Sequence, residues 1–419
     1  MSAGGTLKYL IESPVMVPHM ANPNVLSPIV PYSSDTRLLH IGPHKTGTTS
    51  IQAALHSARA EMSRQGVHMA GRNRHPMAAV LAGVGRPAPN SKAKEAPSRA
   101  KWAALLRDIR SAREPRVVLS SEFFADARPE AIRHVVDELD PSRVQIAVTL
   151  RPLAKVIPSQ WQQYVQAGLR TDMVRWLEGI FGEHPEKTTP SFWYRHRHDH
   201  LIERWAAVAG AENLTAIVVD DRDHDGVLRI FERLLGLSDG LLVADRDLSN
   251  RSMTLPEIEV VRAFNQQYAK TQLGRAVHAK AMRFGAALNM KQRTPSPEEE
   301  RVATPQWAMD RAGTIAREMV ANIRSSGVRV IGDLDLLTTV PTGWEEGDRP
   351  PVQVTPEIAG KAVMGVLESL LADAASTDGK VPTSRDALLE AIPARELAEA
   401  LVDRVTTKVG TALRRRPSK

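Results

Sequence analysis

The sequence contains no cysteine among its 419 residues. That absence excludes disulfide bridges, thiolate metal sites and cysteine nucleophiles from any account of this fold and its chemistry. Acidic residues are also outnumbered by basic ones, 48 against 55, which gives a formal net charge of +7. An excess of this sign suits either a nucleic acid or a strongly anionic small molecule, and composition leaves both open.

Long hydrophobic runs are missing as well. No stretch of about 18 apolar residues occurs, and the N-terminal residues lack the basic region and apolar run of a signal peptide. We therefore expect a cytoplasmic protein without a transmembrane segment. With 42% apolar and 25% charged residues, the composition is that of a globular chain long enough for one large core or two domains.

Lysine and arginine concentrate between Arg86 and Arg116, where nine of them face three acidic residues, and again at the C-terminus. A nucleic-acid-binding surface would interleave aromatic side chains with these cations, and only Trp102 does so here. The pattern therefore favours a solvated basic face, and no nucleic-acid partner is expected.

Short apolar runs alternate with helical patterns from Arg37 onward. The apolar runs lie at 37–41, 117–121, 144–150 and 214–219. The amphipathic patterns between them predict helices at 46–64, 98–112, 129–139, 152–167, 192–209 and 225–235. Strands separated by helices in this way need crossover connections, which predicts an α/β fold with a central parallel sheet.

The chain divides by composition into four parts. Residues 1–36 carry five prolines and no periodic pattern, which predicts an extended leader. We expect the main domain at 37–340, a linker rich in proline, glycine and acid at 341–355, and a helical C-terminal extension with a basic tail at 356–419.

The second half of the main domain is expected to be mostly helical. Thr254 is a good N-cap in front of Pro256 and opens the first of these helices. A long helix is predicted near 297–325, and the apolar segment 328–337 is expected to return to the edge of the sheet.

The strongest local pattern lies between the first strand and the first helix, where residues 40–52 read HIGPHKTGTTSIQ. Glycines let the backbone approach an anion closely, and the amides and dipole of an opening helix favour negative charge. Thr48 and Thr49 add hydroxyl donors, and Lys45 adds a mobile cation. The segment therefore predicts a phosphate-binding loop.

One departure separates this loop from the Walker A pattern of nucleoside triphosphatases. Thr48 follows the second glycine of G-x-x-x-x-G where the pattern requires a lysine, and Lys45 stands two residues before that glycine. A lysine at this earlier position would meet the bridge between a phosphate and the transferring group. Because a sulfuryl group carries less charge than a phosphoryl group, its transfer could proceed without a metal.

The run PHKTGTTSIQ at 43–52 resembles the 5′-phosphosulfate loop of sulfotransferases that use 3′-phosphoadenosine 5′-phosphosulfate (PAPS), of the bacterial type, in which the lysine usually follows proline directly. His44 is inserted at that point. The resemblance implies a P-loop-NTPase-like three-layer sandwich, PAPS as co-substrate, no metal requirement, and transfer to a hydroxyl or amine. It also implies donor contacts from Lys45, Thr46, Gly47, Thr48, Thr49 and Ser50.

A second anion site is predicted where the apolar run 144–150 ends in Arg151. An arginine at the carboxyl end of a parallel strand points into the ligand crevice, and its guanidinium suits a phosphate dianion. Ser159 follows just over two helical turns later and can face the same side. In the family that the loop resembles, this segment binds the 3′-phosphate of the donor, which implies the same for Arg151 and Ser159.

Asn250-Arg251-Ser252 resembles a third segment of that family, which closes over the nucleotide. Two interpretations of Arg251 stay open at this point. It either reaches the 3′-phosphate or belongs to the cap of the helix that follows.

Sulfuryl transfer to a hydroxyl also needs a base to take the proton. Glu122 follows the apolar run 117–121 and should project at the same sheet edge as the phosphate loop, although it could instead cap a helix. His44, which titrates near neutral pH, is the competing base. His75 and Arg74 are candidates for the acceptor pocket, and each histidine could equally lie on the surface.

Two competing functions are less well supported. A kinase of the same fold would need a Walker lysine and an aspartate for magnesium at a strand end, and here that strand ends in Ser-Ser-Glu. A non-enzymatic protein that binds anions or nucleic acid would need aromatic residues among its cations, and this sequence has only Trp102 there. The acceptor could be a carbohydrate, a glycolipid or another small molecule. The sequence is also compatible with a homodimer.

The residues from Asp221 to Glu232 match the EF-hand pattern, which would indicate calcium. An EF-hand requires a helix before its loop, whereas 214–219 is predicted to be a strand. A polar turn between strand and helix is the simpler interpretation.

His196, His198 and His200 alternate along the chain, and two of them are four residues apart, a spacing that binds zinc on a helix. A further ligand is not evident. We therefore expect the start of an exposed amphipathic helix with Trp193 and Trp205 turned inward, and no metal site.

Overall fold

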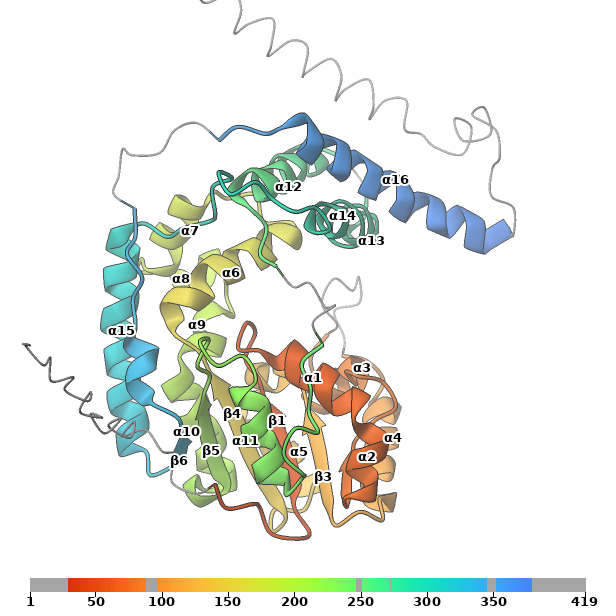
Figure 1. Ribbon diagram of the computed structural model, residues 1–419, viewed down its shortest axis with the longest axis vertical. Helices are drawn as coiled ribbons and strands as arrows, with labels where there is room; N and C mark the ends of the chain where they lie inside the picture. The colour runs from red at the N-terminus through yellow and green to blue at the C-terminus, as the bar shows by residue number, and fades with distance from the viewer. Residues whose placement is uncertain (1–28, 88–95, 246–250, 272, 345–351, 379–419) are drawn as a thin grey trace, which may run out of the picture.

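The computed structural model describes residues 29–87, 96–245, 251–271, 273–344 and 352–378 (Figure 1). Most of the expected leader, part of the linker and the basic tail lie outside the described residues. The described part contains a six-stranded sheet in which every neighbouring pair of strands is parallel. This confirms the predicted α/β fold with a central parallel sheet and helices on its faces.

The order of the strands in the sheet is β2-β3-β1-β4-β5-β6. Their bounds are β1 Arg37–Ile41, β2 Val67–Met69, β3 Arg116–Ser120, β4 Val144–Leu150, β5 Leu214–Val218 and β6 Arg329–Ile331. Because β1 lies between β3 and β4, the segments that follow these three strands meet at one edge of the sheet. That edge carries the loop with Lys45.

Alternation along the strands explains the three layers. Leu39 and Ile41 of β1 belong to the apolar cluster on one face, whereas Leu38 belongs to the cluster on the other. Both faces are buried, as expected for a parallel sheet. One face is covered by α1 Thr48–Ser57, α2 Arg59–Arg64 and α11 Gly226–Leu235, and the other by α3 Met77–Gly83, α4 Arg99–Ser111, α5 Pro129–Glu138 and α10 His198–Ala209.

A separate apolar cluster holds a second group of helices, part of which stands at the far end of the molecule from the sheet in Figure 1 and part of which lies beside the sheet. They include α6 Leu153–Gln166, α7 Met173–Ile180, α12 Leu255–Tyr268, α15 Gln306–Ser325 and α16 Pro356–Asp378, with the short α8 Pro185–Thr188 and α9 Phe192–His196 beside them. One continuous helix is built from α13 Arg275–His278, the π-helical η3 Ala279–Ala286 and α14 Ala287–Lys291. We call α12, α13, η3, α14 and α16 the helical cap.

The described part of the C-terminal extension packs on the rest of this cap. Gly285 of η3 and Gly365 of α16 touch so closely that a Cβ on either residue would lie within 2.6 Å of the carbonyl oxygen of the other. Ile358 and Ala362 of α16 are buried in the same cluster. Glycine is therefore required at both positions of this helix crossing.

Two predicted helices have different bounds in the structure. The long helix begins at Gln306 and not near 297, because Pro295, Pro297 and Pro305 interrupt the preceding residues. The helix predicted at 192–209 is broken at Arg197 into α9 and α10. The apolar segment after α15 returns to the sheet edge as β6, as expected.

One further prediction is wrong. His196 and His198 are fully buried, so the segment around them is not the start of an exposed helix. His196 packs against Phe192 with ring centroids 4.9 Å apart, and burial lowers the pKa of His198 to about 4. Both imidazoles are therefore neutral parts of the interior at physiological pH.

Candidate functional site

The loop after β1 has the shape of an anion-binding turn. Its backbone is left-handed at two positions, Lys45 with φ of 74° and Gly47 with φ of 88°. A Cβ on Gly42 would lie 1.8 Å from the hydroxyl of Thr48, which donates a 2.9 Å hydrogen bond to the carbonyl of Gly42. Helix α1 starts at Thr48, so the amides of Thr48 and Thr49 lack acceptors within the helix and are available to an anion.

The hydroxyl of Thr46 takes part in holding the loop in place. It donates to the carbonyl of Pro43 over 2.8 Å and lies 2.9 Å from the hydroxyl of Thr149 at the end of β4. The ring of His40 lies between Thr149 and Ser120 of β3: its Nε2 atom contacts the hydroxyl of Thr149, and its Nδ1 atom contacts the hydroxyl of Ser120. Thr46 therefore acts inside the protein through its side chain, whereas Thr49 and Ser50 stay at least partly exposed.

Lys45 lies among other cations. Burial lowers its pKa to about 8, and the charges of Lys291, Arg151 and Arg283 act in the same direction. Arg283 and Lys291 belong to the helical cap, and no motif in the sequence points to them. Four cations gathered in one place are an arrangement that could hold a multivalent anion.

Arg151 lies beside the phosphate loop. Its guanidinium donates to the backbone carbonyl of Lys45 over 3.3 Å and to Asp221 over 3.1 and 3.2 Å. Lys155, one turn into α6, donates to the same carboxylate over 2.8 Å. Burial works to raise the pKa of Asp221, but these cations outweigh it and the pKa is lowered. Ser159 lies further along α6 and is half-buried.

Glu122 and His75 form a pair at the end of β3. The Nε2 atom of His75 lies 3.3 Å from a carboxylate oxygen of Glu122 and 2.9 Å from the hydroxyl of Ser121. Burial lowers the pKa of His75, Glu122 opposes this shift, and the charge of Arg74 reinforces it. Both side chains of the pair are about one-fifth exposed, and the Oε2 atom of Glu122 is buried without a hydrogen-bond partner.

His44, the other candidate base, approaches the same place from the phosphate loop. Its ring meets Phe123 edge-on at 5.8 Å, and His75 stacks on that phenyl ring at 5.5 Å. Burial, with a contribution from Arg195, lowers the pKa of His44 to about 3. Its Nε2 atom is buried without a hydrogen-bond partner. The structure thus brings His44 and His75 to one aromatic ring, with Glu122 beside His75.

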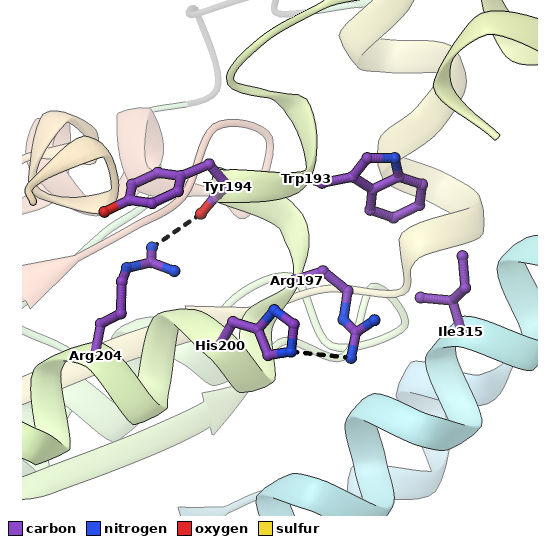
Figure 2. Close-up of a pocket in the computed structure, with 6 residues that line it drawn as sticks. All are labelled: Trp193, Tyr194, Arg197, His200, Arg204 and Ile315. Atoms are coloured by element: carbon purple, nitrogen blue, oxygen red, sulfur yellow. Dashed lines mark hydrogen bonds between the residues drawn. The ribbon is translucent and has the colours of Figure 1, made fainter. Parts of the chain in front are cut away.

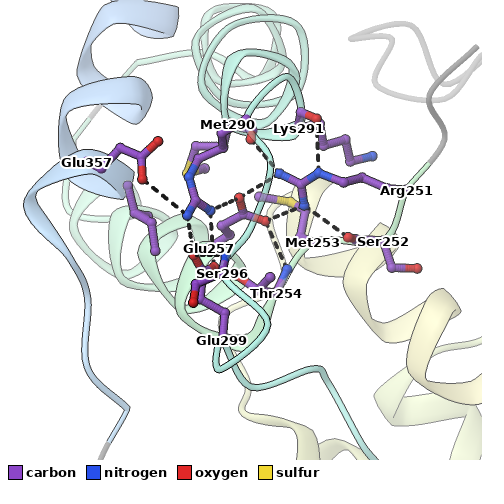
Figure 3. A network of polar contacts seen from close by, with 12 residues as sticks. Arg251, Ser252, Met253, Thr254, Glu257, Met290, Lys291, Ser296, Glu299 and Glu357 are labelled. Atoms are coloured by element: carbon purple, nitrogen blue, oxygen red, sulfur yellow. Dashed lines mark hydrogen bonds and ion pairs between the residues drawn. The ribbon is translucent and has the colours of Figure 1, made fainter. Parts of the chain in front are cut away.

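Arg251 is engaged within the helical cap (Figure 3). Its guanidinium pairs with the fully buried Glu257 over 2.7 Å and donates to the carbonyls of Met290 and Lys291. Glu257 also accepts from Arg293 over 2.6 Å and from the amide of Thr254 over 2.9 Å, which completes the capping box of α12. Of the two interpretations of Arg251, these contacts favour the cap, and they fix the backbone that carries Lys291.

The carboxylates of the segment that matches the EF-hand pattern form hydrogen bonds and ion pairs within the protein. Asp221 pairs with Arg151 and Lys155, Asp223 pairs with Arg229, and the carboxylate of Glu232 accepts from two backbone amides. The segment before the loop is β5, a strand, as predicted. Across the part of the chain that the structure describes, no group of three or more potential ligands is arranged for a metal ion.

A cavity of about 410 Å³ lies between α9, α10 and α15 (Figure 2). Its cations have partners in the protein: Arg197 bonds to Asp199 and Glu318, and Arg204 donates to the carbonyl of Tyr194. Ser121, Glu122 and the phosphate loop do not line it. We assign it no ligand.

No protein-family model and no curated protein matches the chain. Among solved structures, the chain is similar to a sulfotransferase from Alicyclobacillus acidocaldarius, with 17% identity and a TM-score of 0.38. The match covers 59% of this chain and 96% of that one. A likeness at this level says nothing about the activity of this chain. For the described residues, no helix is both long and apolar enough to cross a bilayer.

Proposed function

We propose that the protein is a sulfotransferase that moves a sulfuryl group from PAPS to a hydroxyl of its acceptor. The observation that carries the proposal is the position of Arg151, whose guanidinium bonds to the backbone of Lys45. Lys45 and Arg151, which we predicted to bind the two ends of one donor, thus lie side by side. A single nucleotide can contact both, as the proposal requires.

Lys45 and the loop amides are the groups that bind the 5′-phosphosulfate, and Arg151 with Ser159 binds the 3′-phosphate. Arg283 and Lys291 add positive charge from the helical cap. In the reaction, the acceptor oxygen forms a bond to sulfur while the bond from sulfur to the 5′-phosphate oxygen breaks. The electron pair of that bond stays on the phosphate, where Lys45 neutralises the developing charge.

Glu122 is the proposed base that takes the proton of the acceptor hydroxyl. Its Oε2 atom lies 3.3 Å from Nε2 of His75 and has no hydrogen-bond partner, which leaves that oxygen able to take a proton. His44 is the second candidate. Its lowered pKa leaves it neutral and able to accept a proton, but makes it a weak base.

A kinase is the alternative from the same fold class. Its Mg²⁺-binding aspartate would stand at the end of β3, and Ser120, Ser121 and Glu122 occupy that place. A thermal-shift measurement separates the two functions. 3′-Phosphoadenosine 5′-phosphate (PAP) should raise the melting temperature, and ATP with Mg²⁺ should not. Equal or reversed shifts would remove the sulfotransferase assignment.

The chemistry itself is tested with PAPS labelled in the sulfuryl group. The full-length protein and a cell extract are incubated with it, and the labelled product is isolated. Label on an acceptor hydroxyl is the expected result. Label transfer that persists in the Lys45→Ala variant would contradict the site.

A further inference from the structure

Exposed apolar side chains gather on one part of the molecule. Among the described residues, eleven large apolar side chains are exposed. Eight of them come from residues 273–364, which include the outer helices of the cap in Figure 1: Leu273, Val277, Phe284, Leu288, Val352, Val354, Val363 and Met364. Burying such side chains is favourable, so a cluster of them marks a surface that meets a partner.

Two of these side chains lie on one face of the helix that runs from α13 through η3 to α14. Phe284 is 62% exposed and Leu288, one turn later, is 54% exposed. The guanidinium of Arg283 lies 5.6 Å from the phenyl ring of Phe284. The opposite face of the same helix packs into the core through Met282 and Ala286, so its outward side is not needed for folding.

Along this helix and the residues on either side of it the charge has one sign, and the nearest exposed acids, Glu357 and Glu368, come from α16. Residues 260–297 contain seven lysines and arginines and no aspartate or glutamate, whereas about one residue in nine is acidic over the whole chain. Arg275 and Arg283 are exposed there. Cations interleaved with phenylalanine and leucine are the composition of helices that lie in the interface of a membrane.

The neighbouring helix α16 continues this surface. Its buried side, with Ile358, Ala362 and Gly365, faces the η3 helix. Val363 and Met364 stay exposed next to that crossing. The close contact between Gly285 and Gly365 holds the two helices together, so their outer side chains are presented by one rigid unit.

We propose that the helix from Arg275 to Lys291, together with Val363 and Met364 of α16, binds the surface of an anionic lipid bilayer. Phe284 and Leu288 enter the interface between headgroups and acyl chains, and exposed Arg275, which takes no part in the donor site, meets the anionic headgroups. A second copy of the chain is a poorer partner for this face, because two acid-free segments would bring like charges together. The proposal does not depend on the reaction that the protein catalyses.

The test is sedimentation of the full-length protein with vesicles. We expect binding to an equimolar mixture of phosphatidylcholine and phosphatidylglycerol, little binding to phosphatidylcholine alone, and release at high salt. The double variant Phe284→Ser/Leu288→Ser should lower the partition coefficient about tenfold. Arg275→Glu should lower it on anionic vesicles only.

Val243→Ser is the matched control, because Val243 is 68% exposed and lies outside the cap. Its vesicle binding should equal that of the wild type. Melting temperatures of all variants, measured without lipid, show whether each is folded. Absence of binding by the folded wild-type protein would overturn the proposal. So would a dimer in light scattering that the double variant dissociates.

Discussion

The guanidinium of Arg151 donates a hydrogen bond to the backbone carbonyl of Lys45 across 3.3 Å, between residues 106 positions apart in the chain. This contact joins the end of β4 to the loop after β1. Because both strands are central and parallel, their carboxyl ends can hold the two ends of one ligand. Much of the proposed chemistry can be tested by changing these two residues and their neighbours.

Replacing Lys45 by alanine should lower kcat/KM for PAPS by about a hundred- to a thousandfold, because one preorganised cation is lost from the developing negative charge. Arg151→Ala should mainly weaken PAP binding, by about ten- to a hundredfold. Isothermal titration with PAP and steady-state kinetics check these effects. Lys101→Ala, an exposed lysine on α4, is the control and should change neither.

The affinity for PAP should fall as pH rises through about 8, because Lys45 loses its proton there and no longer attracts the phosphate. The same shift affects folding in the opposite direction. The folded-state pKa lies below the ordinary 10.5, so the unfolded chain binds more protons between these values and stability rises with pH across that window.

Titration calorimetry from neutral to alkaline pH measures the first effect, and urea unfolding at each pH measures the second. In Lys45→Arg the guanidinium stays charged, so the alkaline loss of affinity should be much smaller. Lys291 also has a lowered pKa, caused chiefly by burial, and Lys291→Arg is the parallel control. An unchanged alkaline limb in both variants would contradict the assignment.

Glu122→Gln should lower kcat by about a hundred- to ten-thousandfold with little change in PAP affinity, since the amide cannot take the proton. His75→Phe keeps an aromatic ring beside Phe123 but removes the contact with the carboxylate, and should lower kcat less. Single-turnover kinetics with labelled PAPS measures both. Glu130→Gln, on the exposed side of α5, should behave as the wild type. Full activity of Glu122→Gln would point to His44.

Glu257→Gln should destabilise the protein by about 3–5 kcal/mol, because the change leaves the guanidinium groups of Arg251 and Arg293 without their buried counter-ion. Glu259→Gln on the same helix breaks only the more exposed pair with Arg262, and should cost less than about 1 kcal/mol. Urea unfolding compares the two. Similar losses in both variants would mean that the buried network contributes little.

Much of the sheet could be predicted from the sequence, because four of its strands are continuous apolar runs. The bounds predicted for β1 and β4 agree with the structure. β2 was missed because Val67–Met69 is only three residues long and shows no pattern. The errors at the buried His196 and His198 have a different cause, since polar residues at a helix start are ordinarily solvated.

The candidate site likewise contains residues that could be predicted from the sequence and residues that could not. Lys45, Glu122 and Arg151 lie in the segments that begin where β1, β3 and β4 end, so the parallel sheet brings them to one edge. Arg283 and Lys291 lie in an irregular helix far along the chain, and only tertiary packing brings their charges to Lys45. The role of Arg251 also depends on tertiary packing. Its guanidinium forms an ion pair with the buried carboxylate of Glu257, a contact that the sequence alone does not predict.

The left-handed backbone at Lys45 has a consequence for the evolution of this loop. A side chain in that conformation costs about 1–2 kcal/mol relative to glycine. Selection for stability alone would therefore favour glycine over lysine at this position. A lineage that keeps lysine here retains a less stable loop, and a relative without the proposed sulfuryl transfer is expected to carry glycine at this position.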